Sequence, residues 1–133
     1  MFDKLNEQQI KAVKHIDGPC LVIAGAGSGK TKVLTTRIAY LMEQGISDTN
    51  ILAITFTNKA AKEMRERLNV MVPGTRVFVG TFHSFGLKII RENLELLGMD
   101  KNFTILDSDD VLSLIKKIMK DLGMDIKEIS PYF

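Results

Sequence analysis

The chain has 133 residues, 45% of them hydrophobic, which is enough for one domain with a buried core. Its net charge of +2 excludes an overall basic surface, so any nucleic-acid site must be local. No stretch is long and apolar enough to cross a membrane, residues 1–6 lack a signal-peptide pattern, and a single cysteine excludes an internal disulfide. We therefore expect a protein of the reducing cytoplasm.

Residues 6–13, Asn-Glu-Gln-Gln-Ile-Lys-Ala-Val, predict the start of a helix. Asn6 followed three residues later by Gln9 is a capping box, which needs no ligand. The Gln9 amide could instead read adenine, because its donor and acceptor match N7 and the N6 amino group. This pattern alone favours the cap and leaves both roles open.

The apolar segment Cys20–Ala24 predicts a buried strand in which the cysteine is a small core residue. It leads into Ala-Gly-Ala-Gly-Ser-Gly-Lys-Thr over residues 24–31, the pattern of a phosphate-binding loop. The glycines allow backbone N–H groups to surround a phosphate. Lys30 could then reach the β- and γ-phosphates, and the Thr31 hydroxyl could bind Mg²⁺. The usual first glycine is Ala24 here, at a position that closes the strand and need not approach phosphate.

The remaining chain alternates strand and helix patterns. Further strands are predicted at Ile51–Thr55, Val77–Thr81 and, more weakly, Phe103–Leu106. Helices are predicted at Lys30–Gln44, Asn58–Val70, Ser84–Leu97 and about Asp109–Leu122, with Gly45, Gly98 and Gly123 as stops. In the second of these helices, Ala60, Ala61, Met64 and Leu68 should face inward, and Lys62, Glu63, Arg65 and Glu66 outward. The alternation predicts an α/β fold with a parallel sheet covered by helices.

Two predicted strands end in residues suited to binding nucleic acid. Thr55-Phe56-Thr57-Asn58-Lys59 offers a ring for base stacking and polar groups for phosphate oxygens, or simply a helix start capped by Thr57 or Asn58. In Thr81-Phe82-His83-Ser84, Thr81 and His83 could donate to phosphate, although the histidine could equally cap or pack. Because the carboxyl ends of parallel strands meet at one edge, we expect all three strand ends to lie together, including the one before the glycine loop.

Asp107 follows the weakest predicted strand and could supply the acid that holds Mg²⁺ beside a phosphate loop. The alternative is that Asp107 or Ser108 caps the helix that begins near Asp109. No Asp-Glu pair follows any predicted strand. Farther along, Ser130-Pro131 predicts another helix start, so we expect the chain to be part of a longer protein.

Taken in order, these motifs resemble the amino-terminal part of the UvrD/PcrA/Rep group of superfamily 1 DNA helicases. Leu5–Gln9 resembles the Q motif of that group, and residues 24–31 resemble its motif I. The remaining likenesses are Ile54–Ala61 to motif Ia, Gly80–Ser84 to motif Ib, and Phe103–Asp110 to the passage into the inserted subdomain 1B. The resemblance implies an incomplete RecA-like P-loop NTPase domain 1A over residues 1–106 and the start of the helical subdomain 1B over residues 107–133.

By the same resemblance, the intact protein would use ATP and Mg²⁺ to move 3′ to 5′ on single-stranded DNA and to unwind duplexes, often in repair or replication restart. Gln9 would contact adenine, and Arg37 would support the nucleotide. Lys30 would bind the β- and γ-phosphates, and Thr31 would bind magnesium. The other implied nucleotide-binding residues are Ala24, Gly25, Ala26, Gly27, Ser28, Gly29 and Lys32. The implied DNA-binding residues are Phe56, Thr57, Asn58, Thr81 and His83. The resemblance thus favours the adenine role of Gln9 over the cap and disfavours Asp107 as a metal ligand.

Hydrolysis in this group also needs an Asp-Glu pair, a glutamine-bearing motif, several arginines and a second motor domain, which would lie downstream. We therefore expect this chain alone to be inactive. Two alternatives remain: a small P-loop kinase or phosphotransferase with Asp107 as its metal acid, and a non-enzymatic DNA-binding module.

Overall fold

The computed structural model describes residues 2–124, which fall into two compact units, residues 2–90 and 91–124. The predicted helix start at Ser130 lies outside the described residues. Within the described residues, no helix has the length and apolar character needed to cross a bilayer.

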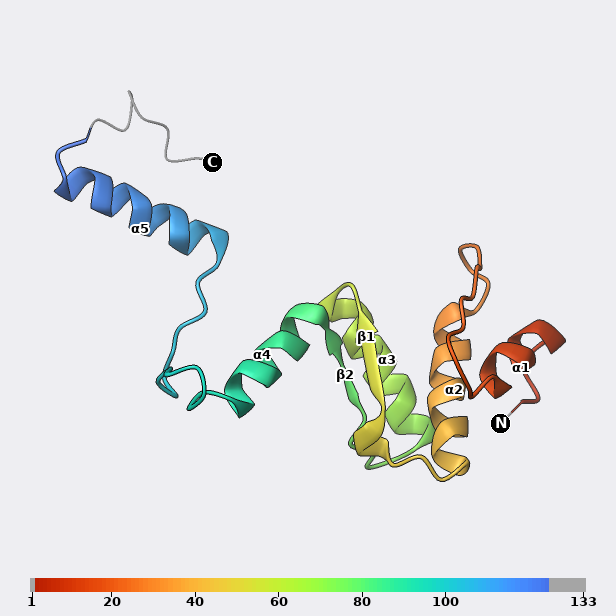
Figure 1. The fold of residues 1–133 in the computed structure, drawn as a ribbon. Coiled ribbons are helices and arrows are strands. Elements are labelled where there is room, and N and C mark those ends of the chain that lie inside the picture. Colours follow the sequence, from red (N-terminus) through yellow and green to blue (C-terminus); the bar gives the residue numbers. More distant parts are fainter. Residues whose placement is uncertain (1, 125–133) are drawn as a thin grey trace. The chain divides into compact units, whose positions relative to one another are not determined.

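The first unit carries most of the secondary structure (Figure 1). In chain order its elements are α1 (Glu7–Lys14), α2 (Lys30–Glu43), the 3₁₀ turn η1 (Asp48–Asn50), β1 (Leu52–Thr55), α3 (Asn58–Met71), β2 (Phe78–Thr81) and most of α4 (Phe82–Glu92). The second unit contains α5 (Ser108–Asp121).

A two-stranded parallel sheet forms the centre of the first unit. β1 and β2 pair in register, with Leu52 opposite Phe78 and Thr55 opposite Thr81. Helix α3 connects the two strands and packs against both, α2 packs against α3, and α1 packs against α2. The predicted strands at Ile51–Thr55 and Val77–Thr81 are confirmed to within one residue, as is their parallel arrangement.

The core lies between α2, α3 and the sheet. Its buried members are Ile38, Ile51, Met64, Leu68 and Val79, drawn from each of these elements and from the residue before β1. On α3, the buried residues recur at intervals of three and four, as the helical period requires. Three of the four predicted inward residues are therefore confirmed, whereas Ala60 is exposed, and the four charged residues predicted to face outward do so.

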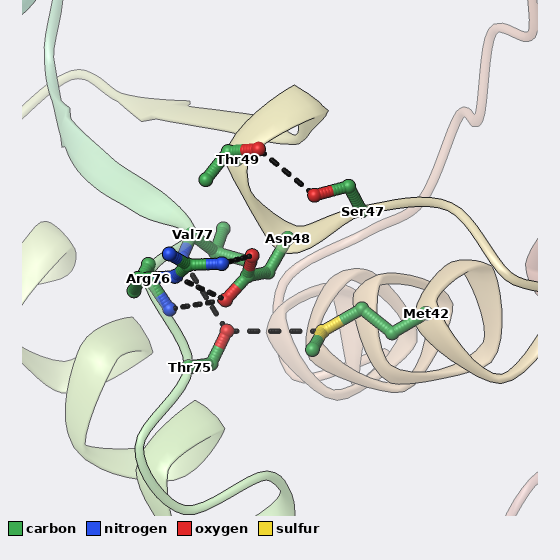
Figure 2. Close-up of polar contacts among 7 residues, drawn as sticks. All are labelled: Met42, Ser47, Asp48, Thr49, Thr75, Arg76 and Val77. Atoms are coloured by element: carbon green, nitrogen blue, oxygen red, sulfur yellow. Dashed lines mark hydrogen bonds and ion pairs between the residues drawn. The ribbon is translucent and has the colours of Figure 1, made fainter.

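An ion pair fixes the entry to β2. The Asp48 carboxylate of η1 accepts from the Arg76 backbone N–H at 2.8 Å and from the guanidinium at 3.2 and 3.4 Å (Figure 2). These hydrogen bonds, first from the backbone and then from the side chain, hold the pKa of the Asp48 carboxyl below its usual value. Next to them the Thr75 hydroxyl donates to the Met42 sulfur at 3.7 Å and so joins this turn to α2.

Two predicted strands are wrong. Neither Cys20–Ala24 nor Phe103–Leu106 forms a strand, and the described residues offer them no sheet partner. Cys20 is exposed rather than buried, and Leu21 and Ile23 are 86% and 91% exposed. An apolar run becomes a strand only when a neighbouring strand pairs with its backbone groups, and here β1 and β2 pair with each other alone.

The predicted helix boundaries hold except in α4. This helix begins two residues before the predicted Ser84, since Thr81 and Ser84 exchange hydrogen bonds across its first turn. It ends at Glu92 rather than Leu97, and turns carry the chain on to Gly98. Gly45 and Gly123 follow α2 and α5 as predicted.

Candidate functional site

The glycine-rich segment at residues 24–31, here called the phosphate loop, folds tightly just before α2. The Ser28 hydroxyl and backbone N–H both donate to the Gly25 carbonyl, at 2.7 and 3.4 Å. Gly27 and Gly29 have φ values of +72° and +83°, which side-chain-bearing residues rarely adopt. Glycines at these two positions are what permits the turn.

Helix α2 begins directly at the end of the phosphate loop. Gly29 is its N-cap and makes no side-chain capping bond, so the first turn starts at Lys30. The first N–H groups of any helix lack intrahelical partners and carry the positive end of the helix dipole. The loop therefore ends at the unpaired N–H groups of a helix terminus, a feature suited to anions.

The Lys30 ammonium lies against the loop itself. Its Nζ donates to the carbonyl of Gly25 at 2.6 Å and to that of Ala24 at 3.2 Å. Thr31 is half-buried on the first turn of α2. The lysine predicted to bind phosphate therefore contacts the loop, whereas the predicted metal-binding Thr31 is placed only by its position on the first turn of α2.

Gln9 spans the space between α1 and the loop. Its amide oxygen accepts from the Asn6 backbone N–H at 2.9 Å, and its backbone N–H donates to Asn6 Oδ1 at 2.9 Å. The predicted capping box is therefore confirmed. The Gln9 Nε2 also donates to the Ser28 carbonyl at 2.9 Å, so the same side chain reaches the loop.

A cavity of about 430 Å³ lies between α1, α2 and the loop. It is lined by Asn6, Gln8, Gln9, Ala12, Cys20, Val22, Ala24, Ser28, Lys30, Val33, Leu34 and Arg37. Four of the predicted nucleotide residues besides Lys30 are among them, namely Gln9, Ala24, Ser28 and Arg37. The apolar and thiol part of the lining was not predicted, because Cys20 and Val22 were expected to lie in a buried strand.

Two further cations tie α2 to the N-terminal segment. The Arg37 Nη1 donates to the Ala12 carbonyl at 2.7 Å, and the Lys32 Nζ donates to the Lys4 carbonyl. Both residues were predicted to bind nucleotide. In this structure they hold α1 and its preceding turn against α2.

The carboxyl ends of β1 and β2 form a second candidate site, here called the strand-end edge (residues 55–58 and 81–84). Thr55 lies opposite Thr81, so the two motifs meet at one edge as predicted. Phe56 is 95% exposed, and His83 is exposed as well. Because the segment before the phosphate loop is not a strand, the expected third strand end is not part of this edge.

Hydroxyl groups at the strand-end edge make local caps. Thr57 caps α3 by accepting from the Ala60 N–H at 3.1 Å, and the buried Thr81 hydroxyl accepts from the Ser84 N–H at 3.2 Å. Gly80 is required beneath them, because a Cβ there would lie 2.5 Å from Ser84 Oγ. The capping alternative for Thr57 is thus confirmed, and the DNA-binding role of these residues stays a prediction.

One further exposed aromatic at this edge, Phe82, was not among the predicted site residues. Phe82 follows β2 directly, as Phe56 follows β1, and is 69% exposed. Its position immediately after a predicted strand, like that of Phe56, could have identified Phe82 as a candidate.

Asp107 caps α5. Its carboxylate accepts from the N–H groups of Asp109 and Asp110 at 2.9 and 2.8 Å, and Asp110 accepts in return from the Asp107 N–H. Among residues 2–124, no group of three or more His, Cys, Asp and Glu side chains could hold a metal ion. The assignment of Mg²⁺ to Thr31 stays a prediction.

Comparison with known proteins gives a consistent result. Residues 5–132 match the family model of the UvrD/REP helicase N-terminal domain. The chain is 52% identical to the ATP-dependent DNA helicase PcrA of Bacillus subtilis, over 98% of this chain and 18% of that protein. It is 51% identical to a probable DNA helicase II homolog of Rickettsia conorii (96% and 20%) and 46% identical to PcrA of Staphylococcus aureus (98% and 18%). The chain spans about a fifth of the length of these relatives.

Proposed function

The chain belongs to the UvrD/REP helicase N-terminal domain family, and from that premise we propose that it is the N-terminal part of an ATP-dependent DNA helicase. The intact protein would couple ATP hydrolysis to 3′-to-5′ movement on single-stranded DNA and to duplex unwinding. The names of the similar proteins support the ATP dependence and the DNA substrate.

One observation carries the proposal. A glycine-rich loop leads into α2 at Lys30, and three of its residues, Ala24, Ser28 and Lys30, line a cavity that Gln9 also lines. The loop and the helix terminus suit the phosphates of ATP, and the Gln9 amide suits adenine at the α1 side of the cavity. We assign this part of the chain to a RecA-like P-loop domain on that basis.

The chemistry follows from the groups at the loop. The Lys30 ammonium now engages two loop carbonyls and would turn to the β- and γ-phosphates when these are bound. The Thr31 hydroxyl on the adjoining turn fits a ligand of Mg²⁺, which would neutralise phosphate charge. Hydrolysis further requires acidic and arginine groups that we place in the downstream part of the protein.

The strand-end edge is proposed to contact single-stranded DNA. The exposed ring of Phe56 can stack on a base, and Asn58 and His83 can donate to the sugar-phosphate backbone. Thr57 and Thr81 shape this edge through their caps.

The decisive test is Lys30→Ala in the full-length protein. We expect DNA-stimulated ATP hydrolysis and unwinding to fall at least about 100-fold, because the substitution removes a charge that stabilises the transferring phosphoryl group. Normal unwinding by Lys30→Ala would refute the proposal. The isolated 133 residues should hydrolyse ATP negligibly, and DNA-dependent turnover by them would contradict our assignment of essential groups to the downstream part.

A further inference from the structure

Both halves of the Gln9 side-chain amide are engaged within the chain. The oxygen accepts from the Asn6 N–H, and the nitrogen donates to the Ser28 carbonyl, each at 2.9 Å. Rotating the amide by half a turn would bring two donors together at Asn6 and two acceptors together at Ser28. These two contacts therefore fix which end of the amide faces the loop.

The contact with Ser28 depends on a close approach of the loop. A Cβ built on Gly29 would lie 3.1 Å from the Gln9 Nε2, tighter than an ordinary contact, and the φ of +83° already favours glycine there. Asn6, Gln9 and Ser28 all line the same cavity. The cap of α1 and the phosphate loop are thus two walls of one site that share a single side chain.

We propose that Asn6 is a positioning residue of the nucleotide site. Its side-chain oxygen holds the Gln9 backbone, and its N–H holds the Gln9 amide oxygen, so the cap sets the polarity of the group that faces the base. This inference rests on the proposed function, in which the cavity accepts ATP. An amide has two lone pairs and two N–H donors, so one of each remains for a base after the contacts described here.

A fixed amide should favour adenine. Adenine offers an N6 donor beside the N7 acceptor, which matches one acceptor and one donor of an amide held in a single orientation. Guanine offers two acceptors, O6 and N7, at the same edge and cannot use the amide oxygen. Losing the Asn6 cap should therefore weaken ATP binding more than GTP binding.

The experiment compares Asn6→Ala with Asn6→Asp in the full-length protein, using DNA-stimulated hydrolysis of ATP and of GTP. Because loss of an N-cap oxygen typically weakens a helix start, we expect Asn6→Ala to raise KM for ATP about fivefold. We expect kcat to stay within about twofold and the preference for ATP over GTP to fall by a similar factor. Asn6→Asp keeps an oxygen acceptor and should restore KM to near the wild-type value.

A variant in the other capping box, at its N3 position, separates positioning from helix stability. Asp110→Ala removes one hydrogen bond from the capping box of α5, which contains no residue of the cavity, and should leave KM for ATP unchanged. If Asn6→Ala leaves KM and the ATP preference unchanged, or changes them no more than Asp110→Ala does, the proposal is overturned.

A second variant covers the case in which Asn6→Ala does not fold. Asn6→Gly also removes the side-chain oxygen that holds the Gln9 backbone but costs less helix stability than alanine, so it should fold and still raise KM for ATP. A wild-type KM for Asn6→Gly would overturn the proposal. The activity of Lys30→Ala distinguishes the two possible failures. If only the role of Asn6 is wrong, Lys30→Ala is still inactive; if the proposed function is wrong, Lys30→Ala is active.

Discussion

The phosphate loop and the strand-end edge are built in different ways. The loop is shaped by contacts between residues a few positions apart, such as Ser28 to Gly25 and Lys30 to Ala24. The edge brings together residues about 25 positions apart through the pairing of Thr55 with Thr81. The loop also follows an exposed apolar segment, whereas the edge stands on a buried core.

The phosphate loop and the strand-end edge therefore depend on different interactions, although both belong to the first unit. Most contacts that shape the loop are local, and Gln9 adds one hydrogen bond from α1. The edge requires β1, β2 and α3 to pack together first. Substitutions in the core should therefore damage the edge most, and substitutions in the loop should alter nucleotide binding with little effect on the edge.

The largest effect is expected for Leu68→Ala. Leu68 is 1% exposed and lies in the core beneath the sheet, so its truncation should lower the free energy of unfolding by about 3 kcal/mol. Chemical denaturation of the full-length protein measures this change. Val70→Ala, on the same helix at an 83% exposed position, is the control and should stay within about 0.5 kcal/mol of wild type. Equal effects of the two variants would contradict the dependence of the edge on the core.

Phe56→Ala should weaken binding of single-stranded DNA about tenfold, since stacking on an aromatic ring contributes about 1–3 kcal/mol per base. Fluorescence anisotropy with a labelled oligonucleotide gives the affinity. Phe56→Tyr keeps the ring and should bind normally, and ATP affinity without DNA should be unchanged in both variants. If the alanine variant binds DNA as wild type does, Phe56 is not a stacking residue.

Gly29→Ala should reduce nucleotide affinity about tenfold, because a left-handed backbone costs a side-chain-bearing residue about 1–2 kcal/mol and the new Cβ would press on Gln9. Calorimetric titration of the full-length protein with MgATP measures the affinity. Gly18→Ala is matched in backbone strain, with φ +76°, but a Cβ there meets nothing within 4 Å. It should therefore leave ATP binding intact, and a similar loss in both variants would exclude a specific role for the Gln9 contact.

The smallest effect concerns the ion pair that fixes the entry to β2. Because the pKa of Asp48 is lowered in the folded state, this carboxylate stabilises the fold above its unfolded pKa, and the contribution is lost as pH falls through the folded pKa. The stability difference between wild type and Asp48→Asn should thus shrink as pH falls from about 5 to 3 and below. Unfolding midpoints measured across this range test the claim, and a constant difference would contradict it.

The prediction from sequence was accurate where short-range patterns decide the structure. The capping box at Asn6, the cap of α5 at Asp107, the helical period of α3 and the glycine turns of the loop each depend on residues within one or two turns. From the sequence, the cap and the adenine contact were alternative roles for the Gln9 side chain. The structure shows the cap with half of the amide's hydrogen-bonding capacity left over.

Two of the four predicted strands did not form, and residues 20–24 show the reason. Those residues are as apolar as β1 and β2, yet only β1 and β2 have each other as partners among the described residues. Because this segment is not a strand of the sheet, Cys20 is exposed and lines the cavity. The residues next to Cys20 in the sequence could not predict that position.

The sequence by itself determined the glycine turns of the loop, the helix caps and the family. Glycine conformations and capping side chains depend on neighbouring residues, and the order of the motifs along the chain indicates the family. Tertiary structure alone decided which apolar runs became strands, which motifs share an edge, and that Gln9 bridges α1 and the loop. Those features depend on backbone pairing and close approach between distant segments, which no short stretch of sequence contains.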